Sequence, residues 1–179
     1  MKRALPLFVL ASASVLSAHA VAGPSIIGSV YMPTIETDGF PDAEPDGLTL
    51  ELRAPLNKNF WIGGLLATTL SSDTVLGTDV ELGASFAVNL GVQAEFAHHV
   101  SGYAYLGYGA AKVLTDDPIL QDVDGKSVAW GAGVQFLLGD HLLVDAGYAS
   151  LFDDEMEGDA GVSGDVAIAG PRVGLGFKF

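Results

Sequence analysis

The sequence predicts an all-β fold: an eight-stranded up-and-down antiparallel transmembrane β-barrel, preceded by a cleaved signal peptide. Three observations predict it. Segments in which apolar and polar residues alternate recur eight times along the chain, and a period of two residues is typical of a β-strand with one apolar face. The connections between these segments are alternately long and short. The first 22 residues have the pattern of a secretory signal.

The signal peptide is expected over residues 1–22. It has a positively charged start, an apolar run over residues 4–16 and two overlapping A-x-A tripeptides, so we expect cleavage after Ala20 or Ala22. Residues 23–179 are then a single barrel domain. The apolar run is shorter than the about 20 residues of a membrane helix, and no later segment is continuously apolar for that length. The mature chain could therefore cross a membrane only as a closed barrel.

Eight strands are expected in the mature chain. They cover residues 25–35, 48–56, 60–70, 80–96, 101–114, 127–138, 142–151 and 165–179. The first is the weakest. In the second, Leu48, Leu50 and Leu52 alternate with Thr49, Glu51 and Arg53, and the sixth alternates in the same way.

The fourth expected strand, residues 80–96, has the clearest pattern. Every second residue from Val80 to Phe96 is apolar, and the residues between them include no large apolar side chain. As a helix this segment would have no apolar stripe. It is longer than the five or six residues of a typical soluble strand and exceeds the about 9–11 that a tilted barrel strand needs. We therefore expect the outward rows headed by Val80 and Leu82 to face lipid.

The connections separate the two ends of the expected barrel. After the first, third, fifth and seventh strands they are mostly long and acidic, and after the second, fourth and sixth they are only a few residues. Residues 36–46, 73–81, 115–124 and 153–165 hold eighteen of the twenty-two acidic residues. Bacterial outer-membrane barrels have long loops outside and tight turns in the periplasm. A soluble periplasmic β-sandwich, the alternative fold, gives no reason for this separation of charge.

Composition excludes several classes of function. The chain has no cysteine, so it offers no disulfide, thiolate metal site or thiol nucleophile. Its formal charge is −14, and without the two basic residues of the signal peptide only six of the eight basic residues remain. Nucleic-acid binding is therefore excluded, because the phosphate backbone needs positive charge. The 23 glycines suit a protein of strands and turns.

Three segments resemble a known family. They are SGYAYLGYGAAKV at 101–113, GKSVAWGAGVQFLLGDHLLVDAGYASLFD at 125–153 and VGLGFKF at 173–179. The chain resembles the small eight-stranded outer-membrane barrels related to the OmpA transmembrane domain, OmpX and the opacity-type proteins. This resemblance implies that the row Val173, Leu175, Phe177 and Phe179 is the signal read by the barrel assembly machinery. Members often carry Arg and Glu in strand seven, where this chain has Asp145 and Gly147.

The polar face of the strands is expected to line the barrel interior, which eight strands leave just wide enough for side chains to fill. The candidate lumen residues are Glu51, Arg53, Glu81, Ser85, Asn89, Gln93, Glu95, Lys112, Gln135, Asp145, Arg172 and Lys178. Charges of both signs in a narrow interior would pair, because an unpaired buried charge costs several kcal/mol. We expect a structural plug of ion pairs, with a gated narrow pore as the alternative.

Catalytic and metal sites have weak candidates. Residues 42–47 match the start of a calcium loop, but its twelfth position holds Arg53 in place of Glu, so the match fails. The spacing of His99 and Ser101 resembles the His-x-Ser of outer-membrane lipid A deacylases, but no acidic residue follows before Val113. Aromatic residues such as Trp61, Tyr103 and Tyr105 are expected in interfacial girdles. No enzyme activity, metal or cofactor is expected.

The function expected from the sequence is therefore non-catalytic. We expect a Gram-negative outer-membrane protein with periplasmic termini and a structural or surface-interaction role through acidic extracellular loops. Its expected partners are outer-membrane lipids, lipopolysaccharide and the assembly machinery, and an extracellular ligand or divalent cations at the loops are left open. The alternatives are a narrow pore or small-molecule channel and a soluble periplasmic binding module.

Overall fold

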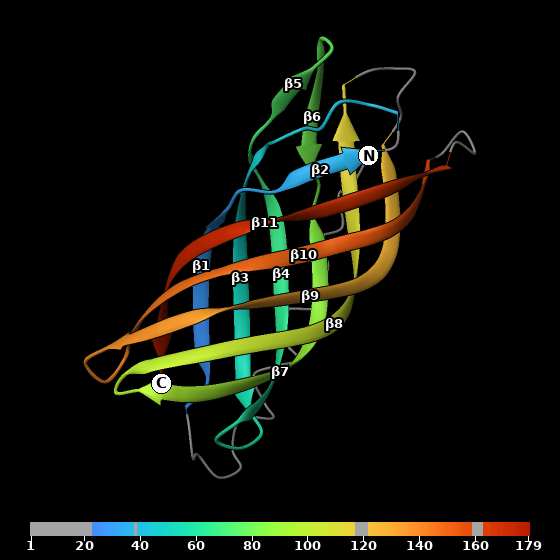
Figure 1. Cartoon of the computed structure of the whole chain (residues 1–179). Helices are drawn as coiled ribbons and strands as arrows, with labels where there is room; N and C mark the ends of the chain where they lie inside the picture. Colours follow the sequence, from blue (N-terminus) through green and yellow to red (C-terminus); the bar gives the residue numbers. More distant parts are fainter. Residues whose placement is uncertain (1–22, 38, 117–121, 159–162) are drawn as a thin grey trace, which may run out of the picture.

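The computed structural model describes residues 23–37, 39–116, 122–158 and 163–179 (Figure 1), so the expected signal peptide lies outside the described residues. The strands are β1 Ser25–Tyr31, β2 Thr34–Thr37, β3 Asp46–Pro55, β4 Phe60–Ser71, β5 Asp73–Val75, β6 Thr78–Leu82, β7 Ser85–Ala97, β8 Val100–Thr115, β9 Val123–Leu138, β10 Leu142–Gly158 and β11 Ser163–Lys178. No helix long and apolar enough to span a membrane is found within these ranges.

Eight of these strands form the closed wall of a barrel. They pair antiparallel in the order β1, β3, β4, β7, β8, β9, β10 and β11, and pairing of β11 with β1 completes the ring. The short strands extend the wall at one end, where β2 pairs with β11 and the β5–β6 hairpin is attached to β8. The predicted eight-stranded antiparallel barrel is confirmed.

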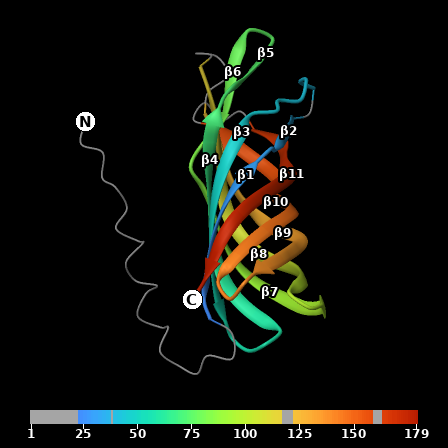
Figure 2. The same ribbon diagram turned by 90° about the vertical axis from the view of Figure 1, so that its left-hand side faces the viewer.

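The two ends of the barrel differ, as the sequence indicates. At one end, here called the turn end, short connections join β3 to β4, β7 to β8 and β9 to β10. His99 and Gly139 have φ angles of 66° and 67° in two of these turns. The remaining connections lie at the opposite end, here called the loop end. Figures 1 and 2 show the β5–β6 hairpin standing at the loop end, opposite the C-terminus.

The expected strand 80–96 is two strands, because one extra residue interrupts it. Leu82 lies opposite Val113 and Phe86 lies opposite Ala110, so four steps along this segment match three steps along β8. Such a bulge reverses which face each later side chain points to. At the interruption the backbone N–H of Gly83 donates to the carbonyl of Lys112 at 2.7 Å.

The bulge overturns one expectation about the lipid-facing row. Leu82 is 1% exposed and packs in the interior with the half-buried Val80, whereas Phe86 is 54% exposed on the outer face. The expectation that Val80 and Leu82 face lipid is therefore wrong, although the row from Phe86 to Phe96 does point outward.

The segment 152–164, expected as an acidic loop, is largely strand. β10 continues into it as far as Gly158, and β11 begins at Ser163. The register of these two strands shifts between Ser150 and Phe152, which inserts one extra residue in β10. The shift turns Phe152 and Met156 into the interior, where both are fully buried. Burial of these apolar side chains stabilises the strand despite its acidic outer face.

The first expected strand is also divided, at Pro33. β1 ends at Tyr31 and β2 resumes at Thr34, because proline has no backbone N–H and restricts the conformation of Met32. The N–H of Met32 donates to the carbonyl of Pro171 at 3.0 Å, so the segment stays attached to β11 across the break.

Large apolar side chains are exposed on the outside of all eight wall strands. They include Val30, Leu48, Leu50, Ile62, Leu66, Phe86, Val88, Leu90, Leu106, Tyr108, Val128, Trp130, Phe136, Leu142, Tyr148, Val173, Leu175 and Phe177. The strands of the described residues belong to one sheet. A β-sandwich needs a second sheet against such a face, so the alternative of a soluble sandwich is wrong.

Candidate functional site in the barrel interior and at the loop end

Seven of the twelve candidate lumen residues are buried inside the barrel. They come from five wall strands: Glu51, Arg53, Ser85, Asn89, Gln135, Asp145 and Arg172. Toward the loop end the interior is apolar instead. Its buried cluster includes Tyr31, Ile35, Leu65, Leu82, Val113, Leu151, Phe152, Met156, Val166 and Ile168. The interior therefore has a polar layer and, beyond it, an apolar layer.

Glu51 is the centre of the polar layer. Arg53, two residues along β3 on the same face, donates to its carboxylate from Nε at 2.8 Å and from Nη2 at 2.9 Å. Arg172 of β11 donates from Nη2 at 2.7 Å. The Glu51 and Arg172 side chains are 0% exposed. Paired guanidinium bonds of this kind are short and directional, so they fix both arginines in position.

Asp145 supplies the second negative charge of the layer. Its carboxylate accepts hydrogen bonds from the hydroxyl of Tyr103 and from Nε2 of Gln135, both at 3.1 Å. Arg172 approaches it at 3.6 Å and Arg53 at 4.0 Å. Two carboxylates thus face two guanidiniums, which makes this group of four side chains formally neutral and satisfies the pairing that buried charges require.

Aromatic rings surround the arginines. The Arg53 guanidinium lies 4.5 Å from the ring centroid of Trp61 and 4.2 Å from that of Tyr103. Trp61 meets Tyr105 edge to face at 5.9 Å. These distances fall within the range of cation–π and aromatic pairing. The expectation that Trp61, Tyr103 and Tyr105 belong to interfacial girdles is wrong, since all three are buried inside.

Glycines on the inner wall make room for these rings. A Cβ atom at Gly91 would lie 2.1 Å from the Trp61 ring, and one at Gly147 would lie 2.6 Å from the Tyr103 hydroxyl. Both glycines occupy inward positions of their strands. A run of inward glycines in neighbouring strands was therefore the sequence signal that large side chains fill the interior at this level.

Several buried donors of the polar layer have no protein acceptor. Within the described residues, these include Arg53 Nη1, Arg172 Nε and Nη1, Trp61 Nε1, Asn89 Nδ2 and the Tyr105 hydroxyl. Buried polar groups of this kind are commonly hydrogen-bonded to internal water. The layer can therefore hold water between its ion pairs.

Five candidate lumen residues lie outside the buried layer. Gln93 and Lys178 are half-buried near the turn end. Glu95 is exposed there and accepts a hydrogen bond from the backbone N–H of His99 at 3.2 Å. Glu81 points outward because the bulge reverses the faces of β6 relative to β7.

Lys112 is also on the outer face, since its neighbours Ala111 and Val113 are the buried ones. Its ammonium lies 2.9 Å from the carboxylate of Asp122. The hydrogen bond from Lys112 lowers the pKa of Asp122 below its usual range. Strand periodicity alone assigns Lys112 outward, so its inclusion among the lumen residues is an error of assignment.

The C-terminal row lies on the outer face of β11. Val173, Leu175 and Phe177 are exposed, and so is Phe179 beyond the strand. The Phe177 ring packs against His141 of the neighbouring turn and against Phe179, with ring centroids 5.2 Å apart in both pairs.

The loop end is strongly acidic. Among the described residues it carries Glu36, Asp42, Glu44, Asp46, Asp73, Asp79, Glu81, Asp116, Asp122, Asp124, Asp153, Asp154, Glu155, Glu157 and Asp165. Lys112 and Lys126 are the basic residues described there. No group of three or more His, Asp or Glu side chains in the described ranges is arranged to hold a metal ion.

The family described as outer membrane protein β-barrel domain matches residues 4–179. No curated protein matches the chain. The chain therefore has a family match over nearly its whole length.

Solved structures share the fold. Ail, the attachment invasion locus protein of Yersinia pestis, is 24% identical with a TM-score of 0.61, over 88% of this chain and 99% of that one. Ail in complex with the heparin analogue sucrose octasulfate is 26% identical with a TM-score of 0.58, over the same shares. Neisserial surface protein A is 13% identical with a TM-score of 0.72, over 90% of this chain and 100% of that one.

Proposed function

The chain belongs to the outer membrane protein β-barrel domain family, and we propose that it is a non-catalytic surface protein of the Gram-negative outer membrane that presents acidic loops to the outside. The observation that carries this proposal is the separation of charge along the barrel. The loop end holds fifteen described acidic residues against two basic ones, whereas the central ion-pair group of the polar layer is formally neutral. Negative charge concentrated at one end attracts oppositely charged partners to that end. It does not by itself favour transport through the barrel.

A narrow pore is the second candidate function. The buried donors without a protein acceptor favour it, because they can hold water in the polar layer. The ion pairs oppose it, since the Glu51, Asp145 and Arg172 side chains are fully buried and hydrogen-bonded to one another or to Tyr103. An ion crossing the barrel would have to separate these pairs, at a cost of several kcal/mol.

The proposed partners follow from the surfaces. The exposed apolar rows on the wall suit the hydrocarbon of the membrane, and the C-terminal row ending at Phe179 is proposed as the segment read by the barrel assembly machinery. Lipopolysaccharide is anionic, so divalent cations would have to bridge it to the acidic loop end.

We also propose that the extracellular ligand is cationic. The solved complex of Ail contains a heparin analogue, sucrose octasulfate, which is a polyanion. An acidic loop end would repel such a ligand. A polycation such as a lysine-rich peptide fits the charge of this chain.

Orientation can be tested with single cysteines, because the chain contains none. Leu76→Cys places a thiol at the tip of the β5–β6 hairpin, and Lys58→Cys places one in the β3–β4 turn. A 5 kDa polyethylene-glycol maleimide added to intact cells should label Leu76→Cys and should label Lys58→Cys only after the outer membrane is opened. Labelling of Lys58→Cys alone on intact cells would reverse the proposed orientation.

Ligand charge can be tested with the barrel in phosphatidylcholine nanodiscs, using decalysine and sucrose octasulfate as probes. Decalysine should bind, with an affinity that falls as salt rises, and octasulfate should not. Neutralising Asp153, Asp154 and Glu155 to their amides should weaken decalysine binding. The same change at Glu95 and Asp140, which are exposed at the turn end, serves as the control. Equal effects of the two sets would refute a role for the loop end.

A further inference from the structure

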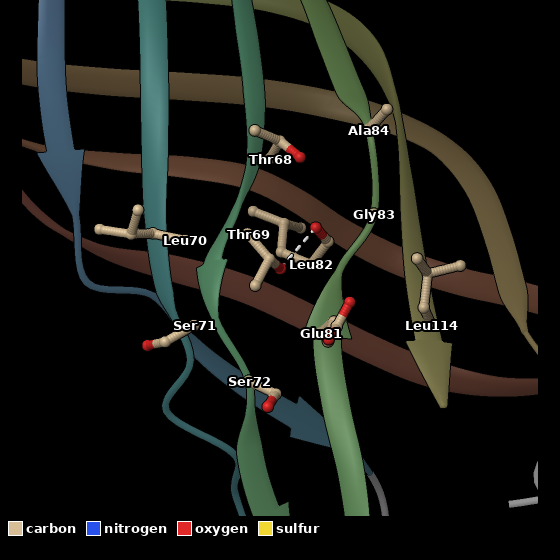
Figure 3. A pocket seen from close by; sticks show the side chains of 10 residues that line it. All are labelled: Thr68, Thr69, Leu70, Ser71, Ser72, Glu81, Leu82, Gly83, Ala84 and Leu114. Carbon is tan, nitrogen blue, oxygen red and sulfur yellow. Dashed lines mark hydrogen bonds between the residues drawn. The ribbon is translucent and has the colours of Figure 1, made fainter. Parts of the chain in front are cut away.

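The barrel wall contains a cleft at the loop end, between β4 and β6. β4 pairs with β7 only as far as Ala67, which lies opposite Ser85. Beyond that point β4 continues to Ser71 paired with β3 alone, while β6 pairs with β5 and β8. The cleft that separates them has a volume of about 480 Å³, within the range of small-ligand sites. Figure 3 shows the two strands passing on either side of it.

One hydrogen bond spans the cleft. The hydroxyl of Thr69 donates to the backbone carbonyl of Leu82 at 2.7 Å (Figure 3). Leu82 itself is buried in the apolar layer of the interior, so it forms the inner boundary of the cleft. The cleft is therefore a recess in the wall and is backed by an apolar surface.

The lining of the cleft combines two kinds of groups. Hydroxyls come from Thr68, Thr69, Ser71 and Ser72, and a carboxylate comes from Glu81. Apolar surface comes from Leu70, Ala84 and Leu114. No basic side chain is part of this lining. The nearby Lys112 is already paired with Asp122 at 2.9 Å, while Ser71 donates to a second carboxylate, that of Asp46, at 3.2 Å.

The cleft is continuous with the lipid-facing surface. Leu66 and Leu70 of β4 and Phe86 of β7 are exposed on the outer face beside it, and Ala84 at its edge is exposed as well. Leu66 lies four residues from Leu70, or about 13 Å along the strand toward the turn end. A molecule with its head in the cleft could extend its hydrocarbon chain along this apolar row into the membrane.

We propose that the cleft binds a single-chain amphiphile whose head group is uncharged or cationic. The hydroxyls accept and donate hydrogen bonds to the head, and Glu81 attracts a positive charge on it. The alkyl chain lies along Leu66 and Phe86. An anionic head is disfavoured, because the lining offers a carboxylate and no cation. This site goes beyond the proposed function and does not depend on the acidic loops binding a partner.

The test uses tryptophan quenching by brominated amphiphiles in phosphatidylcholine nanodiscs. Leu66→Trp in a Trp130→Phe background reports on the row below the cleft. The native chain, whose exposed Trp130 on β9 faces lipid, reports on bulk partition, and Trp130→Phe alone gives the background from Trp61. The probes are 11-bromoundecylamine, 11-bromoundecanol and 11-bromoundecanoate, which share one chain and differ in the head.

Quenching of Leu66→Trp should saturate with probe concentration, unlike that of Trp130. The apparent affinity should be highest for the amine, lower for the alcohol and lowest for the carboxylate. Adding Glu81→Gln should reduce the preference for the amine over the alcohol by about two- to five-fold, the range of an exposed ion pair. Glu95→Gln at the turn end should not change it. Ala84→Phe, which fills the cleft edge, should remove the saturable quenching while the protein keeps its heat-dependent migration on a gel.

Two results would overturn the proposal. The first is quenching of Leu66→Trp in parallel with Trp130 for all three probes, which would mean partition into bulk lipid only. The second is a preference that Glu81→Gln leaves unchanged. If Ala84→Phe does not fold, the Glu81→Gln comparison still decides the question.

Discussion

At the scale of single residues, the barrel interior depends on Glu51. Its carboxylate is fully buried and accepts three hydrogen bonds from two guanidiniums, between 2.7 and 2.9 Å. Burial of one charge costs several kcal/mol, which is offset only while its partners are present. Removal of the carboxylate leaves both arginines inside the barrel with only Asp145 as a charged partner.

Glu51→Gln is expected to lower the free energy of unfolding by about 3–5 kcal/mol, because it leaves uncompensated buried charge. Urea unfolding in detergent micelles, followed by tryptophan fluorescence, measures this. The double variant with Arg172→Gln should lose less than the sum of the two single variants. Glu95→Gln, at an exposed site, should stay within about 0.5 kcal/mol of the native chain. A Glu51→Gln variant as stable as this control would show that the network contributes nothing.

Gly91→Ala is expected to destabilise the barrel by about 1–3 kcal/mol, the usual cost of overpacking. The added methyl group would overlap the Trp61 ring. The same unfolding measurement applies, and Gly28→Ala is the matched control because a Cβ there meets nothing within 4 Å. Equal stability of the two variants would mean that Trp61 can move aside at no cost.

At the scale of elements, the bulges decide which side chains face inward. The extra residue between Leu82 and Phe86 makes Val80 and Leu82, at the start of the predicted strand 80–96, face the interior. The shift after Ser150 likewise reverses the faces of the later residues of β10. Both lie near the level where the polar layer gives way to the apolar one. The bulges thus allow apolar residues from two strands to close the interior at the loop end.

The β5–β6 hairpin turns through Leu76 and Gly77, with φ angles of 52° and 87°. Positive φ at both positions is typical of a type I′ turn, in which Asn-Gly is preferred. Leu76→Asn is therefore expected to stabilise the hairpin by about 1 kcal/mol. Amide hydrogen exchange in β5 and β6 should slow by several-fold. Faster exchange would indicate that the Leu76 side chain, 82% exposed, has a stabilising contact.

The Lys112–Asp122 pair should make a small contribution that depends on pH. The pKa of Asp122 is lowered in the folded state, so the contribution is complete above the usual aspartate value of about 3.9. It is lost as the pH falls through the lowered pKa. Titration of the Asp122 carboxyl by NMR measures the shift, and Lys112→Met should raise the pKa toward the usual value, with the hydrogen bond from the Thr115 backbone N–H still lowering it. An unchanged titration in that variant would exclude Lys112 as the cause.

Much of the fold could be predicted from the sequence, because a period of two defines strands and the alternation of long and short connections defines their order. Glu51 and Arg172 could be assigned to the interior for the same reason. Glu81 could not, since a single extra residue reverses the faces and leaves no mark in the alternation. The side of the wall on which Tyr103 and Trp61 lie could not be predicted, because aromatic rings suit both a lipid interface and an interior lined by glycines.

At the scale of the whole molecule, one closed sheet separates two surroundings. The outer face carries apolar rows on all eight wall strands, as hydrocarbon requires. Inside, the ion pairs of the polar layer and the apolar layer above it fill successive levels of the barrel. Because the interior is filled at both levels, the structure favours a role as a scaffold that carries the loop end and opposes a role as a channel.

Single-channel recording in planar bilayers tests this central claim most directly. The purified barrel should give no reproducible conductance steps, and the current recorded with Glu51→Gln should not exceed that of control bilayers without protein. Reproducible steps in the native protein that disappear when Glu51 or Arg53 is neutralised would contradict the account, because ions would then be crossing the layer that is proposed to close the barrel.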